Sequence, residues 1–291
     1  MLTAMDFAQE YLDRGSDRLG LQVYPDTRED SPAVVIWPAM GVPARYYRPF
    51  ATELAAAGLA VVVADLRGTG TSTPAPSRAS RYGYAELVDD VAAVQDALKA
   101  RLNGRRTILL GHSLGGHVCA LHLALRSADA GRYADAGVAG LVLVAVGMPY
   151  WRTYPGWHRA AILASTRGIA ATSALLGVWP GWKFGGRQAR GVIRDWSYTA
   201  RQGRYPVLDG VDTEAGLAAV RTPVLAVSVS DDRYTPRSAA DHLCAKFAAA
   251  PVERVHYTTG EAGGPLDHFR WVRASAPLAG RVARFADSLP D

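Results

Sequence analysis

Residues 107–126 read TILLGHSLGGHVCALHLALR. The run from Thr107 to Leu110 is apolar and precedes a glycine, which predicts a short buried strand. Apolar residues then recur at helical spacing from Leu114 to Leu125, which predicts a helix. The junction, Gly111-His112-Ser113-Leu114-Gly115, matches the pattern G-x-S-x-G. The stretch therefore predicts a strand, a sharp turn and a helix, with a serine at the apex of the turn.

This geometry favours Ser113 as a nucleophile. Flanking glycines let the strand and helix approach closely, and the strained turn exposes the serine hydroxyl above the sheet. The N-terminus of the following helix offers backbone N–H groups to a developing oxyanion. The alternative is that Ser113 is an ordinary helix N-cap. Because the motif lies on the strand–turn–helix pattern that it requires, we favour the nucleophile.

Composition narrows the class of protein. A chain of 291 residues fits one large domain, or a domain with an insertion. The cysteines, Cys119 and Cys244, have no metal-ligand spacing, and we expect buried thiols. The N-terminal residues do not resemble a signal peptide, and no apolar run reaches the roughly 18 residues of a membrane helix. The arginines are scattered and form no nucleic-acid motif. We therefore expect a cytoplasmic protein without membrane or nucleic-acid partners.

Strands and helices alternate along the chain. The predicted strands are apolar on both faces, which is typical of a parallel sheet covered by helices on both sides. An earlier alternating stretch, Leu19–Val23, predicts an antiparallel strand. The other predicted strands are residues 33–37, 59–64, 107–110, 140–146, 223–229 and 252–257, and the predicted helices are 45–57, 84–102, 114–125, about 237–249 and one from near 277.

The alternation breaks between residues 147 and 220. This stretch has no convincing strand and is rich in aromatic residues, with a Gly185-Gly186 pair. We interpret residues 147–220 as a helical insertion and call it the cap segment. The predicted domains are thus a core of residues 1–146 and 221–291 with the cap segment inserted. Most of its aromatic residues are expected in its own core, with Trp151 as a candidate for lining an acyl pocket.

A nucleophilic serine needs a base and a group that orients the base. The strand ending at Val229 leads into Asp231 and Asp232, at the functional edge of a parallel sheet. We favour Asp232 as the acid, with Asp231 as a turn-forming residue. His268 lies in a glycine- and proline-rich loop after the last predicted strand, where functional residues concentrate. It is the expected base, whereas His242 and His256 fall inside a predicted helix and strand.

The oxyanion hole needs two backbone N–H groups. One is expected from Leu114, directly after the nucleophile, and the other from Met40, in the loop after the 33–37 strand. Competing motifs are weak: Gly68-Thr69-Gly70 lacks the third glycine of a dinucleotide site, and there is no P-loop. His117 and His122 lack zinc-site spacing. The sequence therefore predicts no cofactor and no metal.

Together these motifs resemble the α/β-hydrolase superfamily over essentially the whole chain. The elbow at 111–116, the turn Asp65–Ser72, the Asp232 turn and the His268 loop follow the order of that family. The resemblance implies a mostly parallel eight-stranded sheet flanked by helices, with a helical cap. It also places the acid four residues before a proline, here Pro236, which selects Asp232. The family usually has His-Gly where this chain has Pro38-Ala39.

The cap segment is strongly basic. Residues 149–205 contain nine basic residues and one acidic residue, a net charge of +8, whereas the whole chain is +5. The simpler interpretation of this positive charge is that the basic residues lie on solvated helix faces and reflect codon bias. The sharper hypothesis is an anionic substrate, such as a carboxylated ester or an acyl thioester with a phosphorylated carrier.

The sequence as a whole predicts a serine hydrolase for a small-molecule carboxylic ester or thioester. Ser113 would attack, His268 would move the proton, and Asp232 would orient His268. An amide or a carbon–carbon bond in a diketone could be cleaved by the same groups. The alternatives are a ligand-binding receptor on the same fold, or an enzyme that transfers or cyclises the acyl group. Oligomeric state is not predicted.

Overall fold

The structure of the chain is a computed structural model that describes residues 7–26, 28, 30–128, 137–182 and 184–290. Lys183, one of the basic residues of the cap segment, and residues 1–6 lie outside this description. Among the described residues, no helix combines the length and apolar character that crossing a membrane requires.

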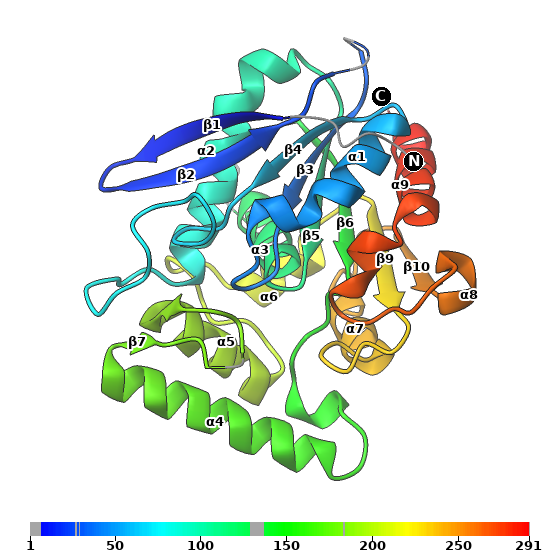
Figure 1. Cartoon of the computed structure of the whole chain (residues 1–291). Coiled ribbons are helices and arrows are strands. Elements are labelled where there is room, and N and C mark those ends of the chain that lie inside the picture. The colour runs from blue at the N-terminus through cyan, green and yellow to red at the C-terminus, as the bar shows by residue number, and fades with distance from the viewer. Residues whose placement is uncertain (1–6, 27, 29, 129–136, 183, 291) are drawn as a thin grey trace.

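An eight-stranded sheet forms the centre of the molecule (Figure 1). Its order is β1-β2-β4-β3-β5-β6-β9-β10, and the strands from β4 to β10 are parallel to one another. β1 and β2 pair antiparallel, as do β2 and β4. This is the predicted mostly parallel sheet, with bounds β1 Ala8–Arg14, β2 Asp17–Val23, β3 Ala33–Trp37, β4 Ala60–Ala64, β5 Thr107–His112, β6 Val138–Val144, β9 Val224–Val229 and β10 Val252–Tyr257.

Helices cover both faces of this sheet, as predicted. One face packs against α2 and α3 through side chains such as Val88 and Val118, and the other against α1 and α9 through Phe50 and Val282. Alternate residues of the central strands feed these two cores. The helices are α1 Arg48–Ala56, α2 Tyr84–Leu102, α3 Leu114–Ala128, α4 His158–Leu176, α5 Arg190–Gln202, α6 Thr213–Ala219, α7 Arg237–Cys244, α8 Thr259–Ala262 and α9 Ala276–Ser288, with 3-10 helices η1 Ala44–Tyr47, η2 Trp151–Thr153 and η3 Arg270–Arg273.

Local chemistry explains several helix limits. The predicted helix at 45–57 is divided into η1 and α1, and Pro49 lies in the first turn of α1, where a missing N–H is tolerated. The helix predicted at 84–102 is α2. It begins after Gly83, whose N–H donates to Glu86 at 2.7 Å, and it ends at Asn103 in the left-handed conformation.

Two features of the sheet structure were not located from the sequence. β1 is half-buried or exposed along its whole length, so its residues show no apolar alternation. The cap segment, where no strand was expected, contains a small antiparallel pair, β7 (Val178–Trp179) and β8 (Gln188–Ala189). Strands of two residues are too short to produce a periodic pattern.

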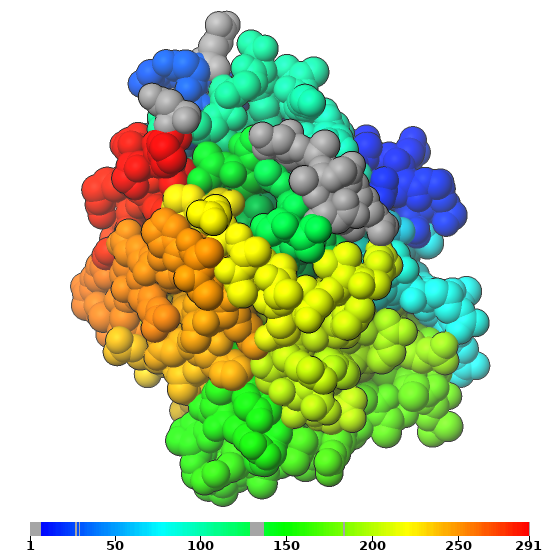
Figure 2. All heavy atoms as spheres, turned by 180° about the vertical axis from the view of Figure 1, so that it is seen from behind, coloured from blue at the N-terminus to red at the C-terminus, as the bar shows by residue number. Residues whose placement is uncertain are grey.

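The cap segment leaves the sheet after β6. Figure 1 shows α4, β7 and α5 gathered below the sheet, with α4 outermost. Seen from behind, green residues of this segment lie beneath yellow and orange residues from later in the sequence (Figure 2). α6 instead packs on α3, because Gly216 lies against the backbone of Ala124. The predicted domain limits at 147 and 220 stay a prediction.

Glycines bring the elbow elements into direct backbone contact. A Cβ at Gly111 would lie 2.2 Å from Gly116 Cα, and one at Gly116 would lie 2.3 Å from a methyl of Val146. A Cβ at Gly115 would lie 1.9 Å from the carbonyl oxygen of Trp37. The start of α3 therefore rests on β5, on the end of β3 and on the segment after β6, with no room for side chains.

This packing leads to a stability prediction for Gly116→Ala. The added methyl overlaps Val146, and we expect the free energy of unfolding to fall by about 1–3 kcal/mol, as for other overpacked sites. Urea unfolding followed by circular dichroism measures it. Gly168→Ala in α4 is the matched control, because nothing lies within 4 Å of its added Cβ. That variant should gain up to about 1 kcal/mol from helix propensity. Equal stabilities for the two variants would contradict the packing argument.

Candidate active site

Ser113 occupies a strained turn between β5 and α3. Its φ is 51°, in the left-handed region that few non-glycine residues adopt. Its carbonyl accepts hydrogen bonds from the N–H groups of Gly116 and His117, so the helix begins immediately after it. The sequence prediction of a strand–turn–helix with serine at the apex is therefore what the structure shows.

His268 and Asp232 form a buried pair at the same edge of the sheet. Asp232 follows β9 and His268 lies in the loop after β10, and both side chains are almost fully buried. The Nδ1–H of His268 donates to Oδ2 of Asp232 at 2.8 Å. A neutral His268 then carries its lone pair on Nε2, where it could accept a proton.

The environment of Asp232 favours its ionised form. Burial raises the pKa of this carboxyl, but the hydrogen bond and electrostatic attraction from His268 and the bonds from Thr235 outweigh it, so the pKa lies below the usual range. The Thr235 hydroxyl donates to Oδ2, and the N–H groups of Tyr234 and Thr235 donate to Oδ1 at 2.8 and 2.9 Å. The carboxylate is fully bonded and held in one orientation.

The less favoured candidates for the acid and the base, Asp231, His242 and His256, lie away from Ser113. Asp231 lies in the turn with φ at 60° and its side chain is exposed. His242 donates from Nε2 to the Gly203 carbonyl at 2.9 Å. His256, on β10, contacts the hydroxyls of Ser228 and Ser230. None of the three lines the cavity that contains Ser113.

The loop after β3 approaches the beginning of α3. The N–H of Ala39 donates to the hydroxyl of Tyr47 at 2.8 Å, and the N–H of Val42 donates to the Ala39 carbonyl. Among the hydrogen bonds of the described residues, none uses the N–H of Met40. Leu114 is the first residue of α3, where a backbone N–H has no partner in its own helix. Met40 and Leu114 both line the cavity next to Ser113.

A hairpin of the cap segment packs on this loop. A Cβ at Gly41 would lie 2.3 Å from the carbonyl oxygen of Gly185, and one at Gly185 would lie 2.5 Å from the Met40 sulfur. The Gly185-Gly186 pair thus brings the backbone between β7 and β8 against the loop that carries Met40. The sequence alone assigned no role to this pair. A close backbone approach is the signal that a glycine pair offers.

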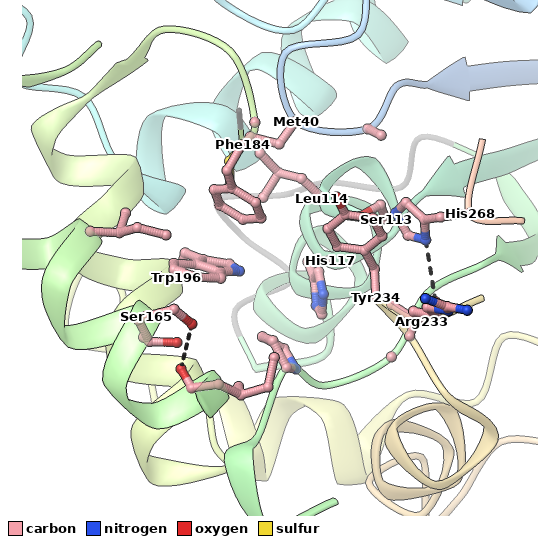
Figure 3. Close-up of a pocket in the computed structure, with 18 of the residues that line it drawn as sticks. Met40, Ser113, Leu114, His117, Ser165, Phe184, Trp196, Arg233, Tyr234 and His268 are labelled. Carbon is pink, nitrogen blue, oxygen red and sulfur yellow. Dashed lines mark hydrogen bonds between the residues drawn. The ribbon is translucent and has the colours of Figure 1, made fainter. Parts of the chain in front are cut away.

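A cavity of about 440 Å³ lies over Ser113. Figure 3 shows Ser113 and His268 on one side and Trp196 and Ser165 on the other. The core supplies Ser113 and His268, and α4 and α5 supply the opposite wall. The wall is mostly apolar and aromatic, formed by Met40, Leu114, Pro149, Tyr154, Ile162, Ile169, Phe184, Trp196, Tyr234 and Phe269.

Trp151 does not line this cavity. It lies in η2, half-buried, with its ring against Tyr150 and the guanidinium of Arg152 at 4.9 Å. The cap segment contributes Tyr154, Phe184 and Trp196 to the wall instead. The sequence shows that the segment is aromatic, but which rings point inward depends on how α4 and α5 pack together.

No group of three or more metal-binding side chains occurs among the described residues. His117 lines the cavity, and its Nδ1 pairs with the hydroxyl of Tyr205. Burial lowers the pKa of His117 to about 4, so this ring is neutral at ordinary pH. Both cysteines are buried free thiols, as expected.

Comparison with known proteins supplies the family. Residues 28–261 match the family described as serine aminopeptidase, S33. The chain belongs to this family of α/β-hydrolases. It is also 30% identical over 229 residues to the predicted carbamate hydrolase RutD of Variovorax paradoxus (strain S110), covering 74% of this chain and 79% of the relative.

Solved structures show the same α/β-hydrolase fold. A soluble variant of monoglyceride lipase from Saccharomyces cerevisiae aligns with a TM-score of 0.68 at 14% identity, covering 98% of this chain and 96% of the lipase. Est1E from Butyrivibrio proteoclasticus, with ferulic acid bound, aligns with a TM-score of 0.63 at 16% identity, covering 96% of this chain and 99% of Est1E. At these identities the likeness concerns the fold.

The lowered pKa of Asp232 predicts a pH-dependent contribution to stability. Its folded pKa lies below the unfolded value of about 3.9, so the carboxylate stabilises the fold above that pH and loses this effect as pH falls through the folded pKa. We therefore expect Asp232→Asn to be less stable at pH 7, by about 1–3 kcal/mol. The difference should shrink as pH falls below about 4.

Urea unfolding between pH 7 and pH 3 measures this difference. The exposed neighbour gives the matched control, because Asp231→Asn removes one carboxylate from the same turn without touching His268 or Thr235. Its stability should follow that of the wild-type protein across this range. If both variants depart from wild type by the same amount at every pH, the buried pair is not the cause.

Proposed function

We propose that this α/β-hydrolase cleaves a carboxylic ester or thioester through an acyl-enzyme on Ser113, with a Ser113–His268–Asp232 triad. The observation that carries the proposal is the 2.8 Å bond from His268 Nδ1–H to Asp232, beside a cavity that Ser113 and His268 both line. This arrangement leaves Nε2 of His268 as the free base of the cavity wall.

The first half-reaction forms the acyl-enzyme. His268 Nε2 takes the proton of Ser113 as its Oγ attacks the substrate carbonyl, and the electron pair of the C=O bond moves to oxygen. The N–H groups of Met40 and Leu114 stabilise this oxyanion. When the carbon–oxygen or carbon–sulfur bond breaks, His268 gives its proton to the leaving alcohol or thiol. Asp232 stabilises the imidazolium throughout.

The second half-reaction returns the free enzyme. Water gives one proton to His268 Nε2 and adds its oxygen to the acyl carbon, and the second oxyanion is held by the same two N–H groups. The bond to Ser113 then breaks, the serine regains its proton and the carboxylic acid leaves. An acceptor alcohol or amine in place of water would give transfer or cyclisation, so product analysis separates these alternatives.

The cavity favours an apolar acyl group. Among the described residues, Arg233 is the only arginine or lysine that lines it, and no carboxylate does. Apolar and aromatic side chains surround a volume of about 440 Å³, enough for a medium-length or aromatic acyl group.

A carbamate is the second candidate substrate, and the relative RutD supports it. Attack by serine on a carbamate carbonyl uses the same base and the same oxyanion site. A carbamate without an apolar substituent would leave most of the cavity unfilled. Comparing acyl esters with N-alkyl carbamate esters of the same leaving group distinguishes the two candidates.

Labelling by a fluorophosphonate probe tests the nucleophile. We expect the wild-type protein to be labelled and Ser113→Ala to lose labelling and esterase activity by at least about 10³-fold. Ser230→Ala is the matched control, because Ser230 also contacts a histidine, His256, at 3.2 Å but lies outside the cavity. Its labelling should equal that of wild type. A folded wild-type protein that is not labelled would favour the receptor alternative.

The basic cap segment predicts a preference for an anionic leaving group. Its described arginines do not line the cavity, so their charge acts on the part of a substrate that stays outside. We expect Arg190→Glu with Arg201→Glu, two exposed changes on α5, to raise KM roughly threefold or more for 4-butyryloxy-3-nitrobenzoate. KM for neutral p-nitrophenyl butyrate should stay within twofold.

Two exposed positions outside the cap segment provide the control for this experiment. Lys99→Glu with Arg284→Glu changes the net charge of the chain equally, and it should leave both KM values unchanged. Equal effects of the cap variant on the anionic and the neutral ester would exclude recognition of an anionic group.

A further inference from the structure

Two adjacent tyrosines of η1 contact three separate parts of the site. Tyr47 is fully buried; its hydroxyl accepts the Ala39 N–H at 2.8 Å and lies 2.7 Å from Nδ1 of His112. Tyr46 donates from its hydroxyl to the carbonyl of Phe269, the residue after His268, at 2.9 Å. The first residue of η1 is also fixed, because the Ala44 N–H donates to the carboxylate of buried Asp65 at 2.6 Å.

The Tyr47 hydroxyl lies between a backbone N–H and a histidine nitrogen. Burial raises the pKa of Tyr47 far above its usual value, so the hydroxyl keeps its proton. Its oxygen accepts from Ala39, and its single proton can be donated to Nδ1 of His112, 2.7 Å away. With Nδ1 as the acceptor, His112 would be the neutral tautomer with its proton on Nε2.

His112 is packed directly against the expected catalytic base. The ring centroids of His112 and His268 are 4.8 Å apart, and Trp271 meets His112 edge-on at 5.2 Å. His112 has no exposed surface. Burial lowers its pKa well below the usual value, and repulsion from the His268 side chain acts in the same direction, whereas the backbone of His268 partly opposes them. Tyr47 and His268 are the titratable groups that face it.

We propose that Tyr47 is a positioning residue that joins the oxyanion loop to the nucleophile elbow and fixes His112 as the Nε2–H tautomer under His268. By holding the Ala39 N–H, Tyr47 sets the loop so that the next N–H, that of Met40, remains for the oxyanion. By donating to His112, it keeps a neutral ring beside His268. This inference rests on the proposed function, because it assigns Tyr47 a task in the same reaction.

The contacts of Tyr47 would stabilise both charges that form in the proposed reaction, the cation on His268 and the oxyanion. When His268 takes the proton of Ser113 it becomes a cation, and a protonated His112 at this distance would repel it. The oxyanion forms at the same moment on the other side of Ser113 and needs a loop that is already in place. One buried hydroxyl thus connects the two sites of developing charge.

The kinetic test compares two tyrosine hydroxyls. Tyr47→Phe keeps the ring and should lower kcat for p-nitrophenyl butyrate roughly 10–100-fold, with KM within twofold, because the transition state is affected and the acyl cavity is not. Tyr24→Phe is the matched control: its hydroxyl is also buried, in the same core, and has no hydrogen-bond partner among the described residues. Its kcat should stay within twofold of wild type.

The second measurement does not depend on turnover. Long-range ¹H–¹⁵N spectra of histidine-labelled protein should show His112 as the Nε2–H tautomer in the wild type, unchanged between pH 5 and pH 9. In Tyr47→Phe, Nδ1 loses its donor, and we expect its ¹⁵N shift to move. A purely structural tyrosine would leave the His112 tautomer as it was.

The two measurements separate the possible failures. A wild-type His112 with its proton on Nδ1, or a Tyr47→Phe variant with unchanged kcat, would overturn the inference. If fluorophosphonate does not label the wild type and no ester is hydrolysed, the proposed function fails and the role of Tyr47 in that reaction fails with it. The spectra would then still report whether Tyr47 fixes the tautomer.

Discussion

Contact between backbones at the elbow is the constraint on which the site depends. The first turn of α3 touches the carbonyl of Trp37 through Gly115 and touches β5 through Gly111 and Gly116. Any side chain at these positions would push the helix away from the sheet. The close approach fixes Ser113 in its strained turn and brings the loop after β3 alongside it. The position of Ser113 and that of the loop after β3 are thus consequences of one packing contact.

The parallel sheet supplies the rest of the constellation. Parallel strands place their carboxyl ends at one edge, so the segments after β3, β5, β9 and β10 meet there although they are far apart in sequence. Asp232 and His268, 36 residues apart, become hydrogen-bonded neighbours in this way. Beneath them Trp271 packs edge-on against Phe50 and His112, so the core of the α1 face supports the His268 loop directly.

Sequence patterns predicted the parts of the molecule that short-range chemistry determines. The elbow, α2 and the buried strands follow from periodicity and glycine placement, and Asp232 was preferred to Asp231 through the family resemblance. β1 was not located because it is not buried on either face. Trp151 was named as a candidate for the acyl pocket, whereas Phe184 and Trp196 line the cavity, because nothing local in the sequence shows which aromatic ring faces inward. The bond between Tyr47 and His112 spans 65 residues and exists only in the folded chain.

The core carries the residues of the proposed reaction, and the cap segment forms much of the cavity wall. The type of reaction is therefore easier to infer from the sequence than the identity of the substrate. The side chains of the proposed triad, Ser113, Asp232 and His268, lie on segments anchored to the sheet, whereas α4, α5 and the β7–β8 turn form the facing wall of the cavity. A change at Trp196 or Phe184 alters the space for an acyl group without touching His268 or Asp232. However, Gly185 also lies against Met40. Movement of the hairpin would therefore reach the loop that carries Met40.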